Sequence, residues 1–270
     1  MPKKEAYRYI ALDLDGTVLD STYHVSPKVV AALAAARETG RKIVVSTGRV
    51  YASALPHARK FGGADGYVCS NGADVFDGSG TRITAHHLDE KVSRSLIALS
   101  RRFDSHFHGF IGDAWHYERE TPFTFRYEAR SGYAGIASDF DSMPVLGFTK
   151  CIFMDDPERL RPIETEIART FGPSVRAVYS APFMLEVMAP GISKSQGLAE
   201  CLVGLGGSLA ETIAFGDAEN DEDMLLAAGI GVAMGNAPDD MKARVGRTAP
   251  SVGEDGVAVW LADFFGFPLP

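Results

Sequence analysis

Short apolar segments alternate with helical segments in the first third of the chain, and this alternation limits the fold more than any other feature of the sequence. Ser26 suits the N-cap of the first helical segment, Pro27 its first turn and Gly40 its end. Strands separated by helices form right-handed crossovers between parallel neighbours. The expected elements are strands at about 9–15, 41–49 and 66–73 and helices at about 26–40 and 50–61.

The alternation of strands and helices stops at about Ile83 and resumes after Gly191. Between these positions short strand-like segments follow one another closely, and two helical segments lie at 87–103 and 157–172. The segment 174–190 is typical of a hairpin. Strands in close succession with helices packed on them favour an α+β module with an antiparallel sheet.

One domain that is interrupted by an insertion explains both patterns, the alternating strands and helices and the closely spaced strands between them. We expect an α/β fold in which residues 1–82 and 189–270 form a doubly wound, Rossmann-like parallel sheet core. The α+β segment 83–188 is then a second domain inserted into that core. The linkers on both sides of the insertion are short.

The composition narrows the class of protein. The 270 residues include 27 lysines and arginines and 35 aspartates and glutamates, a net charge of −8 that argues against nucleic acid or an anionic membrane as partner. No apolar segment approaches the roughly 20 residues of a membrane span, and no signal peptide is visible. The widely separated Cys69, Cys151 and Cys201 predict reduced, buried thiols. We expect a cytoplasmic protein. A monomer is compatible with the sequence, which leaves the oligomeric state open.

Polar residues follow four of the expected core strands. Ligands of open α/β sheets bind at the carboxyl ends of the strands, so these residues share one edge. Each segment alone has a simpler interpretation, such as a helix entry for "STGR" or a turn for "SNGA". Their occurrence in order on one sheet predicts a site. The candidates are Asp13, Asp15 and Thr17; Ser46, Thr47, Gly48 and Arg49; Ser70 and Asn71; and Asp217, Asn220 and Asp221.

The two aspartates of "DLDGT" raise a question of charge. Alternation along a strand would point the carboxylates of Asp13 and Asp15 the same way. Two such charges about 4 Å apart repel by roughly 4 kcal/mol at an effective dielectric near 20. A polar turn is the alternative, since Asp and Gly are common turn residues.

The segment "FGDAENDEDML" favours a cation over a turn. Asp217 ends a strand expected beside the first one, and Asp221 follows about one helical turn later. Four carboxylates at one point would repel strongly, and ligation by oxygen alone suits Mg²⁺. Lys194, at the start of a helix, would supply positive charge for a phosphate, although an exposed lysine is the alternative.

These segments resemble the haloacid dehalogenase (HAD) superfamily of phosphatases, and within it the Cof-type branch, whose large α/β cap is inserted between the second and third motifs. "DLDGTVLD" resembles motif one, "STGR" motif two, Lys194 motif three and "GDAENDEDML" motif four. "SNGA" and "GEDGVAVWL" are also similar to the branch. Ser195 departs from it, because glycine is commoner there.

The resemblance implies roles for the catalytic residues. Asp13 would attack phosphorus and form an aspartyl-phosphate, and Asp15 would act as general acid and then as general base. Thr47 and Lys194 would bind the phosphoryl group, and Asn220 would contact it or orient Lys194. The implied substrate-binding residues are Thr47, Gly48, Arg49, Asn71, Lys194 and Asn220.

The resemblance also implies a metal and a substrate class. Mg²⁺ would be held by the Asp13 carboxylate, the Asp15 backbone carbonyl and Asp217, with Asp221 supporting directly or through water. The expected activity is hydrolysis of a sugar phosphate or a similar small phosphomonoester, with the cap choosing the substrate. Candidate cap residues, for each of which a core or rim role is the alternative, are His106, His108, Trp115, Tyr117 and Arg126.

Other functions remain open on the same residues. A phosphotransferase or phosphomutase differs only in what accepts the phosphoryl group. A receiver-like signalling module also combines an acidic pocket, a Thr and a Lys, but Asp15 and an insertion of about 100 residues argue against it. A catalytically idle binding protein would not need the full set of motifs.

Overall fold

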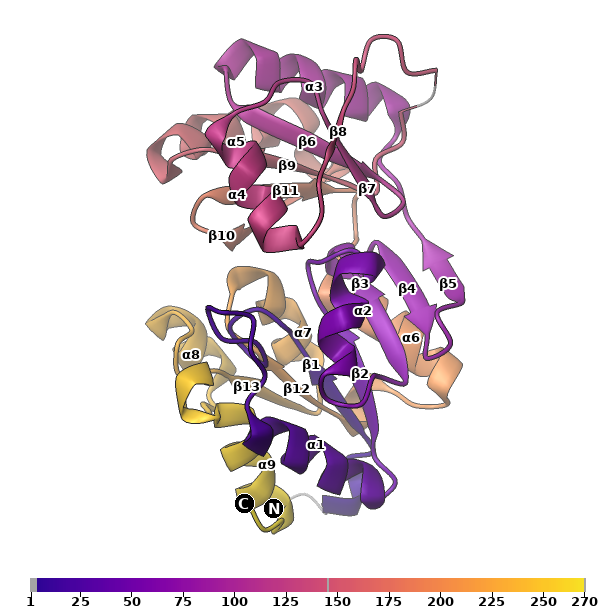
Figure 1. The fold of residues 1–270 in the computed structure, drawn as a ribbon, viewed down its shortest axis with the longest axis vertical. Coiled ribbons are helices and arrows are strands. Elements are labelled where there is room, and N and C mark those ends of the chain that lie inside the picture. The colour runs from indigo at the N-terminus through magenta and orange to yellow at the C-terminus, as the bar shows by residue number, and fades with distance from the viewer. Residues whose placement is uncertain (1–3, 145, 270) are drawn as a thin grey trace. The chain divides into compact units, whose positions relative to one another are not determined.

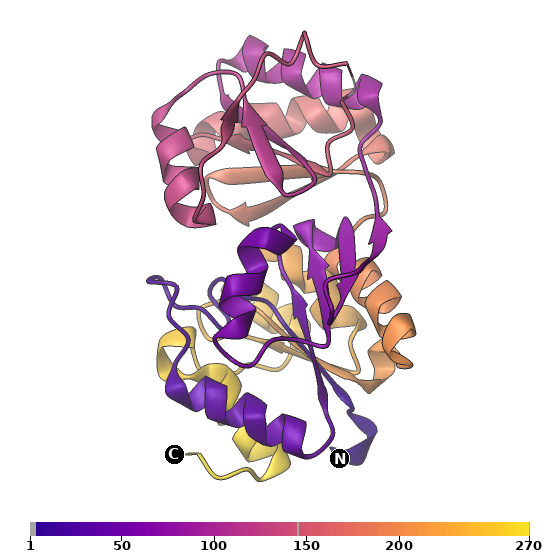
Figure 2. The ribbon, with the colours of Figure 1, turned by 45° about the vertical axis from the view of Figure 1, so that its right-hand side comes forward.

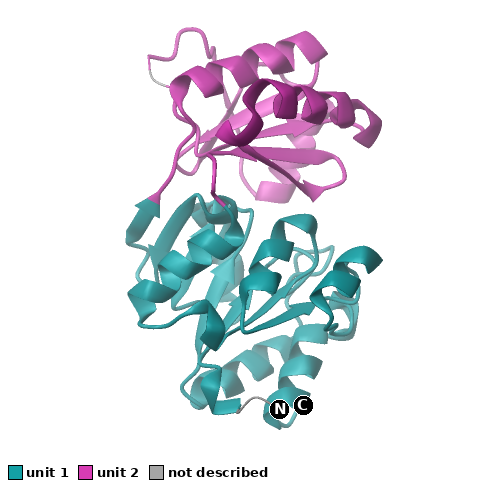
Figure 3. Cartoon of the chain, turned by 180° about the vertical axis from the view of Figure 1, so that it is seen from behind, with its two compact units in different colours: residues 1–84, 193–270 teal, residues 85–192 magenta. Residues whose placement is uncertain are grey.

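The structure is a computed structural model that describes residues 4–144 and 146–269. The chain divides into two compact units (Figure 3). Unit 1 comprises residues 1–84 and 193–270, and unit 2 comprises residues 85–192. That unit 1 carries catalysis and unit 2 selects the substrate stays a prediction.

Unit 1 contains a seven-stranded sheet in the order β13-β12-β1-β2-β3-β4-β5 (Figure 1). The pairs β1–β2, β1–β12, β2–β3 and β12–β13 are parallel, whereas β3–β4 is antiparallel. β1, from the first segment of unit 1, pairs in parallel with β12, from its last segment. This parallel sheet confirms the expected α/β class. The strands are β1 (Tyr9–Leu12), β2 (Lys42–Ser46), β3 (Gly66–Cys69), β4 (Asp74–Asp77), β5 (Arg82–Ala85), β12 (Thr212–Gly216) and β13 (Ile230–Ala233).

Helices cover both faces of this sheet. Ile10 and Leu12 of β1 belong to one buried cluster, which contains side chains of α1, α2 and α9. Tyr9 and Ala11 point to the opposite face and belong to a cluster with α6, α7 and α8. The sheet is therefore doubly wound. The helices are α1 (Pro27–Glu38), α2 (Tyr51–Arg59), α6 (Lys194–Leu205), α7 (Glu222–Ala227), α8 (Asp239–Val245) and α9 (Gly256–Phe265).

Unit 2, the magenta to orange part of the ribbon in Figure 2, contains a six-stranded sheet in the order β10-β11-β9-β6-β7-β8, with the strands labelled in Figure 1. α3 and α5 pack on one face through an apolar cluster, and Tyr127 of α4 packs against His108 and Trp115 on the other. The elements are α3 (Glu90–Phe103), β6 (His106–Ile111), β7 (Ala114–Tyr117), α4 (Pro122–Ser131), β8 (Ile136–Ala137), β9 (Lys150–Met154), α5 (Pro157–Phe171), β10 (Arg176–Ala181) and β11 (Met184–Met188).

Two features of unit 2 bear on the sequence expectations. The hairpin expected over 174–190 is confirmed by the antiparallel pair β10–β11. The sheet is not wholly antiparallel, however, because β7 and β8 are parallel. A parallel pair needs a crossover, which α4 supplies after a capping box at Thr121 and a proline at its first turn. This third helix was not predicted from the sequence.

The first strand is shorter than expected. β1 ends at Leu12, and the amides of Val18 and Leu19 both donate to the carbonyl of Leu14, so a tight turn replaces the strand. The expectation that Asp13 and Asp15 lie on a strand and for that reason point the same way is therefore wrong. The strand expected over 66–73 also ends early, at Cys69, and the chain returns along the antiparallel β4.

Two further expectations concern membranes and cysteines. Across residues 4–144 and 146–269, none of the helices combines the length and the apolar character that a membrane crossing requires. Cys69, Cys151 and Cys201 are all free and buried, which confirms the expectation of buried thiols.

A buried ion pair lies inside unit 2. Lys150 of β9 and Glu186 of β11 are 1% and 2% exposed, and Lys150 Nζ lies 2.7 Å from Glu186 Oε2. The ammonium group also lies 5.0 Å from the centre of the Phe110 ring. Removing two charges from water costs free energy, which the mutual attraction of Lys150 and Glu186 helps to offset.

We predict that Glu186→Leu alone lowers the free energy of unfolding by about 3–5 kcal/mol, because the buried Lys150 ammonium loses the carboxylate to which it donates. Lys150→Met with Glu186→Leu should restore it to within about 1 kcal/mol of the parent. The chain has 2 tryptophans, Trp115 and Trp260. Urea unfolding in a Trp260→Phe background therefore reports on unit 2 through Trp115 fluorescence. Single and double variants of equal stability would contradict the prediction.

Candidate active site

The loop after β1 packs against the end of β12. The amide of Asp13 donates to the carbonyl of Phe215 at 3.1 Å, which continues the parallel ladder by one residue. Gly16 has a φ of +85°, and a Cβ atom there would lie 2.2 Å from Asp217 Oδ2. Only glycine allows this approach. The "DLDGT" segment and Asp217 are thereby brought together.

Three carboxylates converge at this edge of the sheet. Asp13, Asp217 and Asp221 each offer an oxygen, and the three oxygens lie within 4.8 Å of one another. Burial and the neighbouring Asp221 raise the pKa of Asp13 well above its usual value. The same causes raise the pKa of Asp217 to about 7. The cluster is under electrostatic strain that a cation would relieve, and its oxygen donors fit a hard cation such as Mg²⁺.

Lys194 lies between two of these carboxylates. Ser193 caps α6 by accepting from the amide of Gln196, which places Lys194 at the first position of the helix. Its Nζ donates to Asp13 Oδ1 at 2.7 Å and to Asp221 Oδ1, and the residue is 1% exposed. Burial opposes its charge, but Asp13 and Asp221 outweigh burial and raise the pKa of Lys194. Lys194 is therefore a buried cation, and the alternative of an exposed lysine is wrong.

Asp221 has partners on both carboxylate oxygens. Oδ1 accepts from Lys194, and Oδ2 accepts from the amides of Asp217 and Ala218 at 3.0 Å each. These bonds fix the turn between β12 and α7. Whether Asp221 would support a metal directly or through water stays a prediction.

Asp15 and Arg49 form an ion pair beside the cluster. Arg49 donates from Nε to Asp15 Oδ2 at 2.7 Å and from Nη2 to Oδ1 at 2.8 Å. Arg49 also donates to Ser53 Oγ at 2.9 Å and is itself buried. The group of three converging oxygens does not include the Asp15 carboxylate, which a bidentate pair with Arg49 holds. That Arg49 binds phosphate stays a prediction, and in this structure its guanidinium is bonded to Asp15.

The remaining predicted substrate residues lie on the loops after β2, β3 and β12. Thr47 is fully buried, and its Oγ1 accepts from the amide of Arg49 at 3.2 Å. Gly48 lies between these two residues and is half-buried. Asn220 donates from Nδ2 to Asn71 Oδ1 at 2.8 Å, so these two amides join the "SNGA" and "GDAEND" segments.

The "SNGA" segment is more than a simple turn. Asn71 adopts a left-handed backbone with φ 57° and ψ 30°. Gly72 has a φ of +101°, and a Cβ atom there would lie 2.0 Å from the carbonyl oxygen of Ser193. The segment thus packs against the N-terminus of α6, directly before Lys194. Its glycine is required by this close approach.

Two polar residues near the cluster were not predicted from the sequence. Asn236 follows β13 and donates to the Gly16 carbonyl at 2.9 Å and to Asp217 Oδ2 at 3.0 Å. Ser195, noted only as a departure, donates from Oγ to Asp223 Oδ2 at 2.8 Å and so joins α6 to α7. The position of Asn236 after a strand of the same sheet was the available signal for it.

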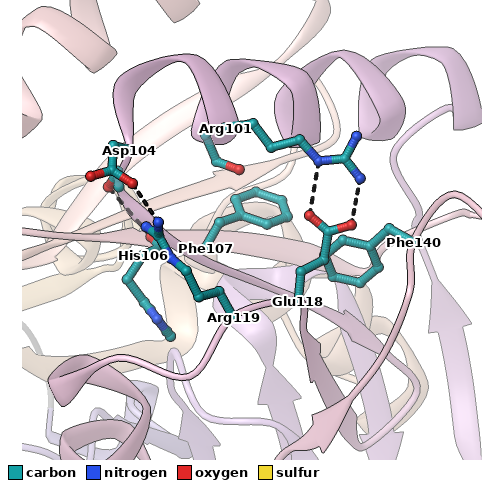
Figure 4. A pocket seen from close by; sticks show the side chains of 9 residues that line it. Arg101, Asp104, His106, Phe107, Glu118, Arg119 and Phe140 are labelled. Atoms are coloured by element: carbon teal, nitrogen blue, oxygen red, sulfur yellow. Dashed lines mark hydrogen bonds and ion pairs between the residues drawn. The ribbon is translucent and has the colours of Figure 1, made fainter.

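Unit 2 has a pocket of its own with a volume of about 240 Å³ (Figure 4). Arg101 is paired with Glu118, and Arg119 with Asp104, so these charges satisfy each other. No group of three metal-ligating side chains was found in the described part of unit 2. The cluster in unit 1 is the stronger candidate. The pocket is lined by Ser100, Arg101, Asp104, Ser105, His106, Phe107, Glu118, Arg119 and Phe140.

The candidate specificity residues of unit 2 divide into two groups. Four of them, His106, His108, Trp115 and Tyr117, are buried in the unit. Burial lowers the pKa of His106 to about 4, so this side chain is neutral at pH 7. Arg126 is exposed, and its guanidinium lies 3.5 Å from the centre of the Phe183 ring.

Known proteins resemble the chain over nearly its whole length. The family model of haloacid dehalogenase-like hydrolases matches residues 10–261. HMP-PP phosphatase of Serratia proteamaculans is 31% identical over 237 residues, which are 87% of this chain and 86% of that protein. A haloacid dehalogenase-like hydrolase from Bacteroides thetaiotaomicron is 28% identical, with a TM-score of 0.84 over 96% of this chain and 100% of that one. A HAD-superfamily phosphatase from the same organism is 27% identical, with a TM-score of 0.82 over 99% and 98%.

The fold, the order of the motifs along the sheet edge and these similarities agree with one another. The chain belongs to the haloacid dehalogenase-like hydrolases and is a phosphatase of their Cof-type branch.

Proposed function

We propose that this protein is a magnesium-dependent phosphomonoester hydrolase in which Asp13 carries the phosphoryl group from substrate to water. The observation that carries this proposal is the buried cluster of Asp13, Asp217 and Asp221 with Lys194 among them. Such a site combines a nucleophile with charge that can offset a phosphate dianion. Phosphoryl transfer depends mainly on positioning and on stabilisation of charge.

Asp13 is the proposed nucleophile. Its Oδ1 accepts from Lys194, so we assign the attack to Oδ2. In the first step Oδ2 forms a bond to phosphorus while the bond from phosphorus to the leaving oxygen breaks. In the second step a water oxygen bonds to phosphorus, and the bond to Oδ2 breaks. Asp13 is returned unchanged and the product is inorganic phosphate.

Lys194 and Thr47 would neutralise and orient the phosphoryl group. Lys194 is held in place by two carboxylates, so its position is fixed before substrate binds. The Thr47 hydroxyl accepts from the Arg49 amide, which leaves its hydrogen to be donated to a phosphoryl oxygen. Preorganised donors of this kind stabilise developing charge without reorganisation at the moment of reaction.

Residues of unit 1 would hold Mg²⁺ beside these groups. The Asp13 and Asp217 carboxylates and the Asp15 backbone carbonyl would be its protein ligands, with Asp221 acting through the turn that it fixes. When bound, Mg²⁺ would supply the positive charge that the carboxylate cluster lacks and that a phosphate requires. Burial and the neighbouring Asp221 raise the pKa values of Asp13 and Asp217, and a bound cation would favour the charged form of both carboxylates.

Asp15 is the proposed general acid and base. It would protonate the leaving oxygen in the first step and take a proton from the attacking water in the second. Its two oxygens are bonded to Arg49 in this structure. To act, Asp15 must exchange at least one of these bonds for one to the leaving oxygen. Arg49 is thus better supported as a partner of Asp15 than as a phosphate ligand.

The proposed substrate is a small phosphorylated metabolite. Relatives of the chain include HMP-PP phosphatases, which makes HMP-PP a compound to test alongside sugar phosphates. We assign the choice among substrates to unit 2, as the resemblance implies for a cap. A phosphotransferase or mutase would use the same residues of unit 1 with an acceptor other than water.

We predict that phosphate release from at least one such ester requires Mg²⁺ and stops in excess chelator. Calcium should support it poorly, because its larger and looser coordination suits in-line transfer less well. A colorimetric screen of sugar phosphates, nucleotides and phosphorylated cofactors measures this. Full activity after exhaustive metal removal would contradict the metal assignment. Transfer to an added alcohol or sugar in place of phosphate release would indicate a phosphotransferase.

We predict that Asp13→Asn lowers turnover by at least about a thousandfold without loss of stability. The amide cannot attack phosphorus, whereas its oxygen can still accept from Lys194. Asp263→Asn, on the exposed side of α9, makes the same change of charge and serves as the control. Steady-state rates and melting temperatures check both variants. Retained turnover in Asp13→Asn would exclude Asp13 as the nucleophile.

A further inference from the structure

Asn236 links three segments of unit 1. It follows β13, and its Nδ2 donates to the carbonyl of Gly16 at 2.9 Å and to Asp217 Oδ2 at 3.0 Å. Its Oδ1 accepts from the amide of Val252 at 2.9 Å. Both hydrogens and the oxygen of the side chain are therefore used. The reversed orientation of the amide would set its oxygen against two other oxygens, so the hydrogen bonds fix it.

Asn236 helps to orient the carboxylate of Asp217. Oδ2 of Asp217 accepts from Asn236, and Oδ1 accepts from Thr17 Oγ1 at 3.3 Å. The two donors come from different loops, one after β13 and one after β1. Gly16 presents no side chain between them. The position of both oxygens is thus set before any cation binds.

The side-chain donors to Asp217 carry no charge, whereas each of the other three aspartates has a charged side-chain partner. Asp13 and Asp221 are paired with Lys194, and Asp15 is paired with Arg49. No ion pair is found for Asp217 among residues 4–144 and 146–269. A neutral donor orients a carboxylate without cancelling its charge. Asp217 is therefore the aspartate of the site that is both oriented and left without a paired cation in the described part of the chain.

We propose that Asn236 is a positioning residue that holds the Asp217 carboxylate ready for the divalent cation, an inference that rests on the proposed function. Partners of metal ligands commonly contribute 10-fold to 100-fold to metal affinity, because they fix the orientation of the ligand. Asn236 would not touch the metal or the substrate. Its effect would be on the affinity for the cation through Asp217.

The test is Mg²⁺ binding to Asn236→Ala, measured by calorimetry in the absence of substrate. We expect affinity to fall by about 10-fold relative to the parent. The Mg²⁺ concentration needed for half-maximal phosphatase activity should rise by a similar factor. Asn236→Ser, whose side chain is too short to span both acceptors, is measured in place of the alanine variant if that variant does not fold, with the same expectation.

Glu254→Ala is the matched control. Glu254 accepts from the amide and hydroxyl of Ser251, the residue before Val252. Loss of the Glu254 side chain therefore loosens the turn at residues 251–254, which Asn236 contacts through Val252, without removing a partner of Asp217. We expect it to bind Mg²⁺ as the parent does. Parent-like affinity in the Asn236 variant, or an equal loss in Glu254→Ala, would overturn the inference. A parent protein that hydrolyses phosphate esters but binds no Mg²⁺ would overturn the proposed metal instead.

Discussion

The contact of Lys194 with Asp13 and Asp221 is the interaction on which the rest of the site depends. A lysine and two aspartates are buried together at the edge of the sheet, where each alone would be strongly disfavoured. The lysine comes from the start of α6, after the chain has passed through unit 2, and Asp13 directly follows the first strand. The contact between Lys194 and Asp13 therefore forms only when the two parts of unit 1, which are far apart in the sequence, assemble. Even with Lys194 in place, the cluster has more negative than positive charge.

The distribution of partners among the four aspartates explains how one acidic site can serve several roles. Asp13 and Asp221 share a cation from α6, and Asp15 is held by Arg49 from the loop after β2. The side chain of Asp217 accepts from the neutral donors Thr17 and Asn236. Carboxylates that lie close together thereby have different partners and different chemical environments. In the proposed function this separation distinguishes the nucleophile, the acid and base, and the residue that faces the cation.

Much of the fold could be predicted from the sequence, because the alternation of strands and helices is set by local patterns of residues along the chain. The doubly wound sheet and the β10–β11 hairpin followed from it. Features set by tertiary contact did not. The turn after Leu12, the antiparallel β4 and the parallel pair β7–β8 depend on which segments meet. For the same reason, the motifs predicted the residues of the cluster, whereas the pairing of Arg49 with Asp15 needed the structure.

The most direct test of the two-step scheme is rapid-quench kinetics of Asp15→Asn with an activated aryl phosphate. That leaving group needs no acid, so transfer to Asp13 should proceed, whereas hydrolysis of the intermediate needs the base and should stall. The scheme predicts a burst of up to about one equivalent of phenol and a phosphorylated protein by mass spectrometry. Asp13→Asn combined with Asp15→Asn should show neither. With Mg²⁺ binding intact, the absence of both burst and phosphoprotein in Asp15→Asn would contradict the scheme.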